Sequence, residues 1–297
     1  MAANPKVVKR RIKSIGNTMK ITKAMELVAA SKMRRAVESV LATRPYATIA
    51  WEMIDAIAKA TGDVTHPLIE QNEQAERQLV ILFIADRGLA GGYNVNILKE
   101  TLRTIREDDV PYDAIVVGKR GIAPLEREKV PVIATFENLS NKAEFKDILP
   151  MAKMALDAFQ EGKYKTVKIA YTDFISGLTQ KPRIFDLLPL GQPEEGLGEV
   201  KGSEEEVSKE KTNEYTFEPS PVEVLDRVLE RLVETMIYQA LLESTASEHA
   251  ARMMAMRNAT DSAKDMLAEL KFAYTRLRQA SITQEIAEIS SGKAALE

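Results

Sequence analysis

The sequence has 297 residues, of which 45% are hydrophobic and 29% are charged, and its formal net charge is −3. This length allows one large domain or two smaller ones, and no stretch approaches the roughly 18 to 20 consecutive apolar residues that a membrane span needs. Cysteine is absent, which excludes disulfides, thiolate catalysis and cysteine-bound zinc. Because no stretch is apolar enough to span a membrane, any membrane association is expected to come through a partner protein.

The amino-terminal segment is predicted to form one long basic helix. Apolar residues recur at three- and four-residue steps between Lys6 and Thr61, and only Gly16 and Pro45 interrupt them as potential helix breakers. The first 35 residues carry ten basic side chains and one acidic one, Glu26. Transit peptides also start with basic residues, but here the apolar rhythm continues and no cleavage region follows. We therefore expect a retained helix that attracts acidic partners.

The middle of the chain has the pattern of a Rossmann-like α/β domain. Short apolar runs alternate with helical stretches, which favours a largely parallel sheet over residues 78–190. The expected strands are residues 79–85, 114–117, 130–134 and 167–171. The expected helices are residues 95–107, 121–128 and 143–161. Residues 191–220, rich in Gly, Pro and Glu, are predicted to be an acidic, solvated linker.

The carboxyl-terminal segment is predicted to be a second, longer helix. Residues 222–291 contain no Gly or Pro, so this helix would be roughly 105 Å long. A helix of this length needs a partner, and the amino-terminal helix is the obvious one. Segments 1–61 and 221–297 are therefore predicted to pair as an antiparallel coiled coil, with a carboxyl-terminal overhang of roughly 20 Å. The expected apolar seam is Leu225, Leu229, Leu232, Met236, Ala259, Ala263, Met266, Leu270, Ala273, Leu277 and Ala280.

One loop of the central domain lies where a phosphate-binding turn would lie. The sequence ADRGLAGGYN, residues 85–94, follows a predicted strand and opens a predicted helix, so its glycines could bring N–H groups to an anion. The spacing is not G-x-G-x-x-G, and no Lys-Ser or Lys-Thr pair follows. A tight strand-to-helix turn is therefore favoured. The residues of interest in this loop are Asp86, Arg87, Gly88, Gly91 and Gly92.

The remaining polar residues give no sign of catalysis. His66 and His249 have no neighbours with metal-site spacing and are expected to be surface or packing residues. The acidic residues are scattered, and no pair stands out as an acid and base. The basic group Lys32, Arg34 and Arg35 could hold phosphate or carboxylate, or could be an ordinary solvated helix face. No catalytic residue, metal ion or cofactor is expected.

Four segments together resemble the gamma subunit family of F-type ATP synthases, of the bacterial type. They are SIGNTMKITKAMELVAASKMRRA at 14–36, ADRGLAGGYN at 85–94, SEHAARMMAMRNATDSA at 247–263 and RQASITQEIAEI at 278–289. The resemblance spans the chain. Ala90 stands where many members have Cys, and the predicted linker is short and thiol-free, which puts chloroplast-type redox control out of reach.

The resemblance implies a rotor subunit without chemistry of its own. The coiled coil would stand inside a ring of alpha and beta subunits, and the α/β domain would lie against the epsilon subunit and the membrane ring of c subunits. The shaft would transmit torque between the c ring and the catalytic ring, and so set the conformations of the catalytic sites. The expected location is the cytoplasmic face of a bacterial cell membrane, reached through partners only.

The resemblance also implies contact residues on both helices. Met25, Lys32, Arg34 and Arg35 would meet acidic levers on the beta subunits, and Arg278, Gln279 and Thr283 would meet polar loops higher in the ring. Beyond them an apolar stripe recurs at helical spacing where the shorter helix cannot cover it, which predicts a bearing in an apolar sleeve of the ring. This bearing consists of Ile282, Ile286 and Ile289.

Two other classes of function compete with this interpretation. A nucleic-acid binder with a basic coiled-coil arm would bind more weakly as salt increases, but aromatic residues total only 6% and are not interleaved with the basic ones. A nucleotide-dependent enzyme would need the glycine loop at 85–94 to bind phosphate and would hydrolyse ATP without other subunits.

Overall fold

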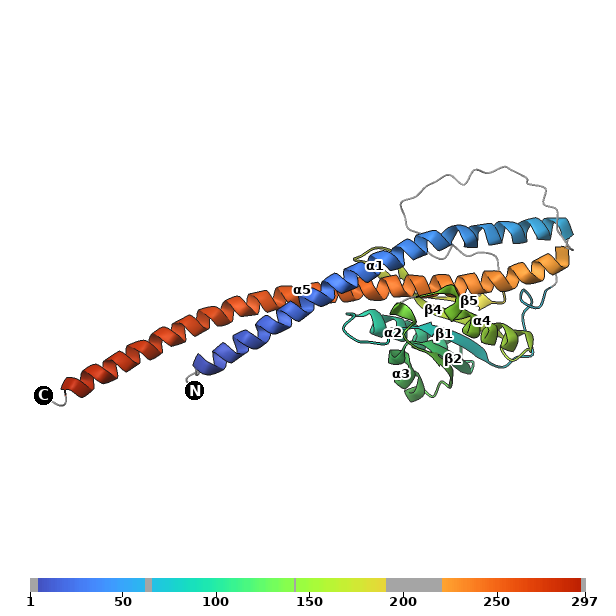
Figure 1. Ribbon diagram of the computed structural model, residues 1–297. Helices are drawn as coiled ribbons and strands as arrows, with labels where there is room; N and C mark the ends of the chain where they lie inside the picture. The colour runs from blue at the N-terminus through green and yellow to red at the C-terminus, as the bar shows by residue number, and fades with distance from the viewer. Residues whose placement is uncertain (1–4, 62–65, 142, 191–220, 295–297) are drawn as a thin grey trace. The chain divides into compact units, whose positions relative to one another are not determined.

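The computed structural model describes residues 5–61, 66–141, 143–190 and 221–294 (Figure 1), with side chains at 5–43, 66–140, 143–190 and 223–291. The acidic stretch predicted to be a linker, residues 191–220, lies outside the described residues. The chain divides into two compact units. Unit 1 combines Met1–Ala29 with Met253–Glu297, and unit 2 is Ala30–Arg252.

Both terminal segments form single, unbroken helices, as predicted. Helix α1 is Pro5–Thr61, with 57 residues, and helix α5 is Pro221–Ala294, with 74 residues. Pro221 begins α5 at a position where the missing N–H costs nothing, and Glu223 in the first turn interacts favourably with the helix dipole. Because each helix contributes to both units, the division between the units does not follow the helix ends.

Unit 1 is an antiparallel pair formed by the first part of α1 and the last part of α5. Small and hydroxyl side chains are buried on both helices, including Ala29 at 2% exposure and Ala263 at 8%, which lets the backbones approach closely. The hydroxyls of Thr22 and Thr260 are hydrogen-bonded to each other across the pair at 2.8 Å. The predicted coiled coil is therefore present in this unit.

Unit 2 contains the α/β domain, whose five-stranded sheet has the order β3-β2-β1-β4-β5. All neighbouring strands are parallel except β4 and β5, so the predicted parallel sheet is confirmed with one antiparallel edge. The strands are β1 (Gln78–Phe83), β2 (Tyr112–Val117), β3 (Val132–Phe136), β4 (Thr166–Phe174) and β5 (Gln180–Leu188). The helices are α2 (Tyr93–Glu107), α3 (Ile122–Arg127) and α4 (Phe145–Gln160), with 3-10 turns η1 (Lys119–Gly121) and η2 (Leu139–Asn141).

Strand β5 was not predicted from the sequence. Its residues are partly exposed at most positions, and Pro182 and several charged side chains interrupt the apolar pattern. The strand lies at the edge of the sheet, where a residue without an N–H is tolerated because only one side of the strand is paired.

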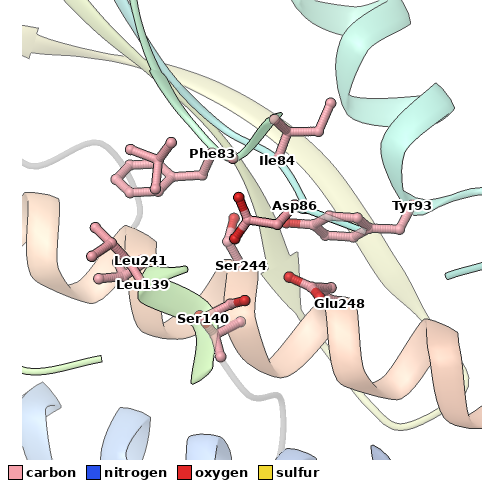
Figure 2. A pocket seen from close by; sticks show the side chains of 12 residues that line it. Phe83, Ile84, Asp86, Tyr93, Leu139, Ser140, Leu241, Ser244 and Glu248 are labelled. Atoms are coloured by element: carbon pink, nitrogen blue, oxygen red, sulfur yellow. The ribbon is translucent and has the colours of Figure 1, made fainter. Parts of the chain in front are cut away.

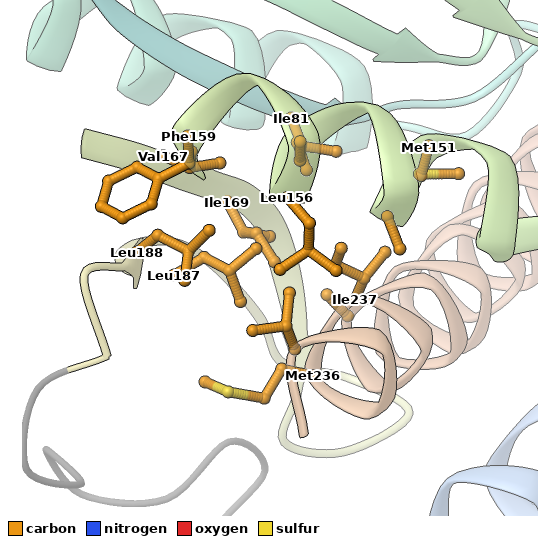
Figure 3. Packing of buried hydrophobic residues seen from close by; sticks show 14 of the residues in the cluster. Ile81, Met151, Leu156, Phe159, Val167, Ile169, Leu187, Leu188, Met236 and Ile237 are labelled. Atoms are coloured by element: carbon orange, nitrogen blue, oxygen red, sulfur yellow. The ribbon is translucent and has the colours of Figure 1, made fainter. Parts of the chain in front are cut away.

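The sheet separates two hydrophobic cores, because successive side chains of a strand point to opposite faces. Leu79, Ile81 and Phe83 of β1 pack on the face covered by α4, whereas Val80 and Leu82 pack on the face covered by α2 and α3. The first of these cores is shown in Figure 3, where Met236 and Ile237 of α5 lie against residues of α4 and the sheet.

The partner of the first part of the α5 seam differs from the prediction. The sequence suggested that the amino-terminal helix covers the whole seam, but Leu225, Leu229, Leu232 and Met236 are buried in the core of the α/β domain. The error arose because a helical apolar stripe shows that a partner exists and does not show which element it is.

Among the described residues, no helix is long and apolar enough to cross a membrane.

Candidate functional site

The carboxyl edge of the sheet is the place where a doubly wound domain would bind a ligand. Strands β1, β2 and β3 follow one another outward, and β4 then returns to the other side of β1, so the strand order reverses between β1 and β4. Ligands of such folds bind outside the carboxyl ends of the strands at this point. A small pocket lies here, lined by residues that include Phe83, Asp86, Tyr93, Ser140 and Glu248 (Figure 2).

The glycine loop joins the carboxyl ends of three strands. The Asp86 carboxylate accepts hydrogen bonds from the N–H groups of Lys119, at 3.2 Å, and Asn138, at 2.8 Å, which follow β2 and β3. The Ala85 N–H donates to Oδ1 of Asn94 at 3.1 Å, which closes the loop onto the start of α2. The loop is thus a tight strand-to-helix turn, and both Asp86 oxygens already accept N–H donors within the chain.

The glycines have distinct places in this turn. Gly91 has φ +57°, in the left-handed region, and Gly92 is the N-cap of α2. A Cβ on Gly88 would lie 3.3 Å from Nη2 of Arg120. Arg87 itself is exposed.

The closest backbone approach at this edge occurs at a glycine that the sequence analysis did not single out. Gly118 has φ +110°, and a Cβ there would lie 1.9 Å from the carbonyl oxygen of Ile84. The Gly118 N–H donates to the carbonyl of Phe136 at 2.8 Å. This close approach brings the loops after β1 and β2 within reach of one another, and the Asp86 hydrogen bond to Lys119 follows from it.

The pocket is too small for a nucleotide. Its free space is about 10 Å³, which is about the room that one water molecule needs, whereas ligand pockets typically measure hundreds of Å³. The hydroxyl oxygen of Thr245 lines it and has no hydrogen-bond partner among the described residues. The phosphate-binding alternative for the 85–94 loop therefore has no space to support it.

Helix α5 fills the position of the ligand with a buried polar stretch. Its residues between 239 and 249 include seven polar side chains that are at most 5% exposed, which is unusual for a helix and requires polar partners. They are Gln239, Glu243, Ser244, Thr245, Ser247, Glu248 and His249. We call residues 239–252 the polar stretch of α5.

The polar stretch makes three hydrogen bonds to the backbone of β4. The Thr172 N–H donates to the Ser244 hydroxyl at 3.1 Å, and the Ser247 hydroxyl donates to the Thr172 carbonyl at 3.0 Å. The Phe174 N–H donates to the Glu243 carboxylate at 3.0 Å. Side chains of a helix thus satisfy backbone groups of a strand.

The last turn of the polar stretch contacts the glycine loop. Arg252 donates to Oε1 of Glu248 at 2.6 Å and to the carbonyl oxygens of Arg87 and Gly88, at 3.3 and 3.4 Å. Ala251 packs against the small apolar cluster of Ala85, Ala90 and Tyr93. The two motifs at 85–94 and 247–263, which are far apart in the sequence, therefore meet in the fold.

Burial perturbs the ionisable groups of the polar stretch. Desolvation raises the pKa of Glu248, and the Arg252 guanidinium partly offsets this. Burial, followed by the positive charges of Arg252 and Lys32, lowers the pKa of His249 to about 4. The His249 ring is therefore neutral near pH 7. Its Nε2 lies 3.3 Å from the Ser140 carbonyl oxygen, which can only accept, so Nε2 carries the proton.

The predicted contact residues lie away from this pocket. In unit 2, Arg34 and Arg35 are exposed, whereas Lys32 is half-buried and influences His249, so these three basic residues do not form a uniform surface. In unit 1, Met25 is half-buried.

The residues predicted on the carboxyl-terminal part of α5 are exposed in unit 1. Arg278, Gln279 and Thr283 all face solvent. The three isoleucines predicted to form a bearing are exposed as well, at 46%, 59% and 74% for Ile282, Ile286 and Ile289. Their roles stay predictions, because the chain is described without a partner.

The sequence analysis missed the polar stretch of α5. The signal was present, because Gln239, Glu243, Ser244 and Ser247 interrupt a strongly apolar part of the helix at positions three and four residues apart. A helix face that is polar and also lies next to apolar seam positions indicates packing against backbone or polar groups. His249 was expected to be a surface or packing residue and is a buried packing residue.

Fold and site together define a class of protein: a two-helix coiled coil with an inserted doubly wound domain whose ligand crevice is filled by the protein's own helix. The ATP synthase family profile matches residues 4–296. The ATP synthase gamma chain of Legionella pneumophila (strain Corby) is 40% identical over 99% of this chain and 100% of that protein. That of Dehalococcoides mccartyi (strain CBDB1) is 42% identical over 99% of each. The chain belongs to the ATP synthase gamma chain family.

A solved structure has the same fold. The rotor chain of the Euglena gracilis mitochondrial ATP synthase in rotational state 1 superposes with a TM-score of 0.62. It is 19% identical and covers 94% of this chain and 98% of its own length. The resemblance of the four sequence segments to the gamma subunit family is thus confirmed over the full chain.

Proposed function

We propose that this chain is the central rotor stalk of a bacterial F-type, proton-translocating ATP synthase and transmits torque between the membrane c ring and the catalytic ring. The full-length family match carries the proposal, together with two unbroken helices of 57 and 74 residues. Long helices transmit rotation because each backbone hydrogen bond links one turn to the next along the whole length.

In this proposal the chain has no catalytic activity of its own. The position where an α/β domain would bind a nucleotide is filled by the polar stretch of α5, and the free space that is left holds about one water molecule. The nucleotide sites then belong to the partners. An asymmetric shaft in a pseudo-threefold ring favours a different set of open and closed sites at each angle, which couples rotation to nucleotide affinity.

We assign the partners from the family. The alpha and beta subunits would surround the coiled coil, and the epsilon subunit and c ring would contact the α/β domain. The complex would lie at the cytoplasmic face of the cell membrane, with this chain held there by its partners. No nucleic acid is involved in this proposal.

The contact residues are assigned from the family, and exposure and chemistry support several of them. The exposed Arg34 and Arg35 suit acidic segments of the beta subunits, since guanidinium groups bind carboxylates with two parallel hydrogen bonds. Lys32 and Met25, which are half-buried, are assigned to the same contact from the family alone. Arg278, Gln279 and Thr283 offer directional contacts to polar loops. Three exposed isoleucines on a helix leave an apolar stripe that water solvates poorly, so a surrounding apolar sleeve would stabilise it.

Reconstitution tests the proposal. The tagged chain is expressed with alpha and beta subunits of a bacterial ATP synthase, and the retrieved complex is combined with the membrane sector in vesicles. We expect all three chains in one complex, no ATP turnover by the isolated chain, and ATP-driven proton pumping only when the chain is present. Turnover by the isolated chain, or pumping of equal yield without it, contradicts the proposal.

A further inference from the structure

Strand β4 extends beyond its neighbour β1 and exposes one side of its backbone. The pairing of β1 with β4 ends at Leu82 and Ala170, whereas β4 continues to Phe174, with β5 as its only strand partner among the described residues. Thr172 lies opposite Pro182, which has no N–H, and the N–H and carbonyl of Thr172 form hydrogen bonds with α5 on the other side of the strand. Buried backbone groups of this kind need partners.

Helix α5 takes the place of β1 along this extension. Ser244 and Ser247 satisfy both backbone groups of Thr172, and Glu243 satisfies the N–H of the next outward-facing residue, Phe174. The helix therefore continues the hydrogen-bonding pattern of the sheet with side chains. Thr172 is 2% exposed and Glu243 is fully buried, so water cannot replace these bonds without opening the interface.

A second attachment follows within roughly the next one to two helical turns of α5. Arg252 donates to the carbonyls of Arg87 and Gly88, and His249 donates to the carbonyl of Ser140. The two loops that carry these carbonyls are tied to each other by Asp86. The polar stretch is thus held at the ends of β4, β1 and β3 at once, by bonds that point in different directions.

We infer that the polar stretch of α5 is the joint through which torque passes between the α/β domain and the coiled-coil shaft, with Ser244, Ser247 and Arg252 as its positioning residues. The inference rests on the proposed function. The apolar seam of Leu225, Leu229 and Leu232 holds the helix to the domain, but apolar contacts are non-directional and resist rotation of the helix about its axis only weakly. Hydrogen bonds depend on angle and resist it.

The arrangement also explains why two distant motifs belong together. The 85–94 loop has the position of a phosphate-binding turn, and the carbonyl groups of its residues 87 and 88 receive the guanidinium of α5. The loop thus binds a helix of its own chain where a nucleotide-binding domain binds its cofactor.

The test compares three variants in the reconstituted complex. Ser244→Ala with Ser247→Ala removes the β4 bonds at nearly unchanged volume, and Arg252→Lys keeps a positive charge beside Glu248 but loses the guanidinium fork. Leu229→Ala, buried in the apolar seam at 1% exposure, is a matched destabilising control. Ser262→Ala, on an exposed part of the same helix, is the neutral control.

Three quantities are measured for each variant. They are the ATP hydrolysis rate, the protons pumped per ATP hydrolysed, and the torsional stiffness of the rotor in single-molecule rotation, all well below the unfolding midpoint. For the serine pair and Arg252→Lys we expect hydrolysis within about twofold of the parent and at least a twofold loss of stiffness, with fewer protons pumped per ATP. Leu229→Ala should lower the unfolding midpoint most and leave stiffness unchanged.

Two outcomes overturn the inference. One is that the serine pair variant and Arg252→Lys both keep the torsional stiffness and the proton pumping of the parent. The other is that the loss of stiffness and pumping follows the fall in the unfolding midpoint. Leu229→Ala would then lose at least as much stiffness and pumping as the serine pair variant and Arg252→Lys. Failure of the parent chain to assemble or to support pumping rejects the proposed function instead, so the two failures are distinguishable.

Discussion

Two parts of helix α5 differ sharply although they belong to one continuous helix. In the polar stretch, residues 239–252, polar side chains are buried and bonded to the backbone of the α/β domain. Between residues 278 and 291 nearly every side chain is exposed, the isoleucines included. Burying polar groups fixes the orientation of the helix against the α/β domain, whereas the exposed isoleucines have no such contacts among the described residues. It is for this second part of the helix that we propose contact with another chain.

The largest effect on stability should come from breaking the buried ion pair of the polar stretch. Arg252→Ala leaves the Glu248 carboxylate, whose side chain is only 6% exposed, without its cation. We expect a loss of about 3 to 5 kcal/mol in the free energy of unfolding, measured with urea at pH 8. Arg257→Ala, at an exposed position of the same helix, is the control and should cost under about 1 kcal/mol.

The same variant has a signed pH dependence. Burial raises the pKa of Glu248, and loss of Arg252 raises it further. The folded variant then takes up a proton that the unfolded chain releases, so the difference in stability between the parent and the variant narrows as pH falls from 8 towards 5. Equal losses for Arg252→Ala and Arg257→Ala at pH 8 would show that the pair is not held in a buried site.

The next effect concerns His249. Its pKa is about 4 in the folded protein and about 6.5 when unfolded, so the unfolded chain binds more protons between these values and stability falls as pH drops. Between pH 7 and 5 this costs about 2 kcal/mol, by the same relation. His249→Gln does not titrate and should lose about 2 kcal/mol less than the parent over this range. Parallel pH profiles for the two proteins would contradict a buried neutral ring.

The basic group Lys32, Arg34 and Arg35 should affect coupling more than folding. Arg34→Ala and Arg35→Ala, at exposed positions, should each change the free energy of unfolding by under about 1 kcal/mol, because exposed charges are well solvated, and half-buried Lys32→Ala is combined with them. Protons pumped per ATP should fall in the reconstituted complex. The matched control removes three exposed basic residues elsewhere on α1: Lys9, Arg10 and Lys13. If both triple variants pump the same number of protons per ATP, the Lys32, Arg34 and Arg35 group is only a solvated surface.

The smallest effect is expected at the carboxyl end of α5. Deletion from Gly292 onward should slow ATP turnover in the complex less than Arg278→Ala with Gln279→Ala does. Apolar contacts are non-directional, so the helix can lose its last residues and still rotate inside an apolar sleeve. Polar contacts depend on angle, and other residues cannot replace them. Arg276→Ala with Gln284→Ala, both exposed on the same helix, is the control pair. If the deletion proves more harmful, the proposed separation of bearing and polar contacts is wrong.

The sequence predicted the elements whose pattern is local. The two helices followed from helical apolar spacing with few potential breakers in α1 and none over residues 222–291 of α5, and β1, β2 and β4 followed from their apolar runs. Strand β5 was missed because Pro182 and charged residues are acceptable only at an edge, and edge position is a property of the whole sheet.

The site was less predictable than the fold. The loop at 85–94 was singled out as a turn, but its partner Arg252 lies more than 150 residues later in the sequence. The family resemblance covered both segments without indicating that they touch. Ser244 lies outside the four family segments and Ser247 begins one of them, but neither could be assigned a contact, because their partners are backbone groups, which leave no trace in a sequence. Side-chain pattern predicts that a face is buried and does not identify what buries it.

Gly118 places a limit on how relatives of this protein can vary. Every other amino acid carries a Cβ, which would lie 1.9 Å from the carbonyl oxygen of Ile84, an overlap with backbone that no rotamer change relieves. Gly16 and Gly177 have no atom within 4 Å of such a Cβ and are free of this constraint. Natural variation should therefore be abundant at these two positions and absent at Gly118 wherever β1 and β2 keep their close approach. In a relative with another residue at position 118, β1 and β2 must lie further apart, and so must the loops that follow them and contact α5.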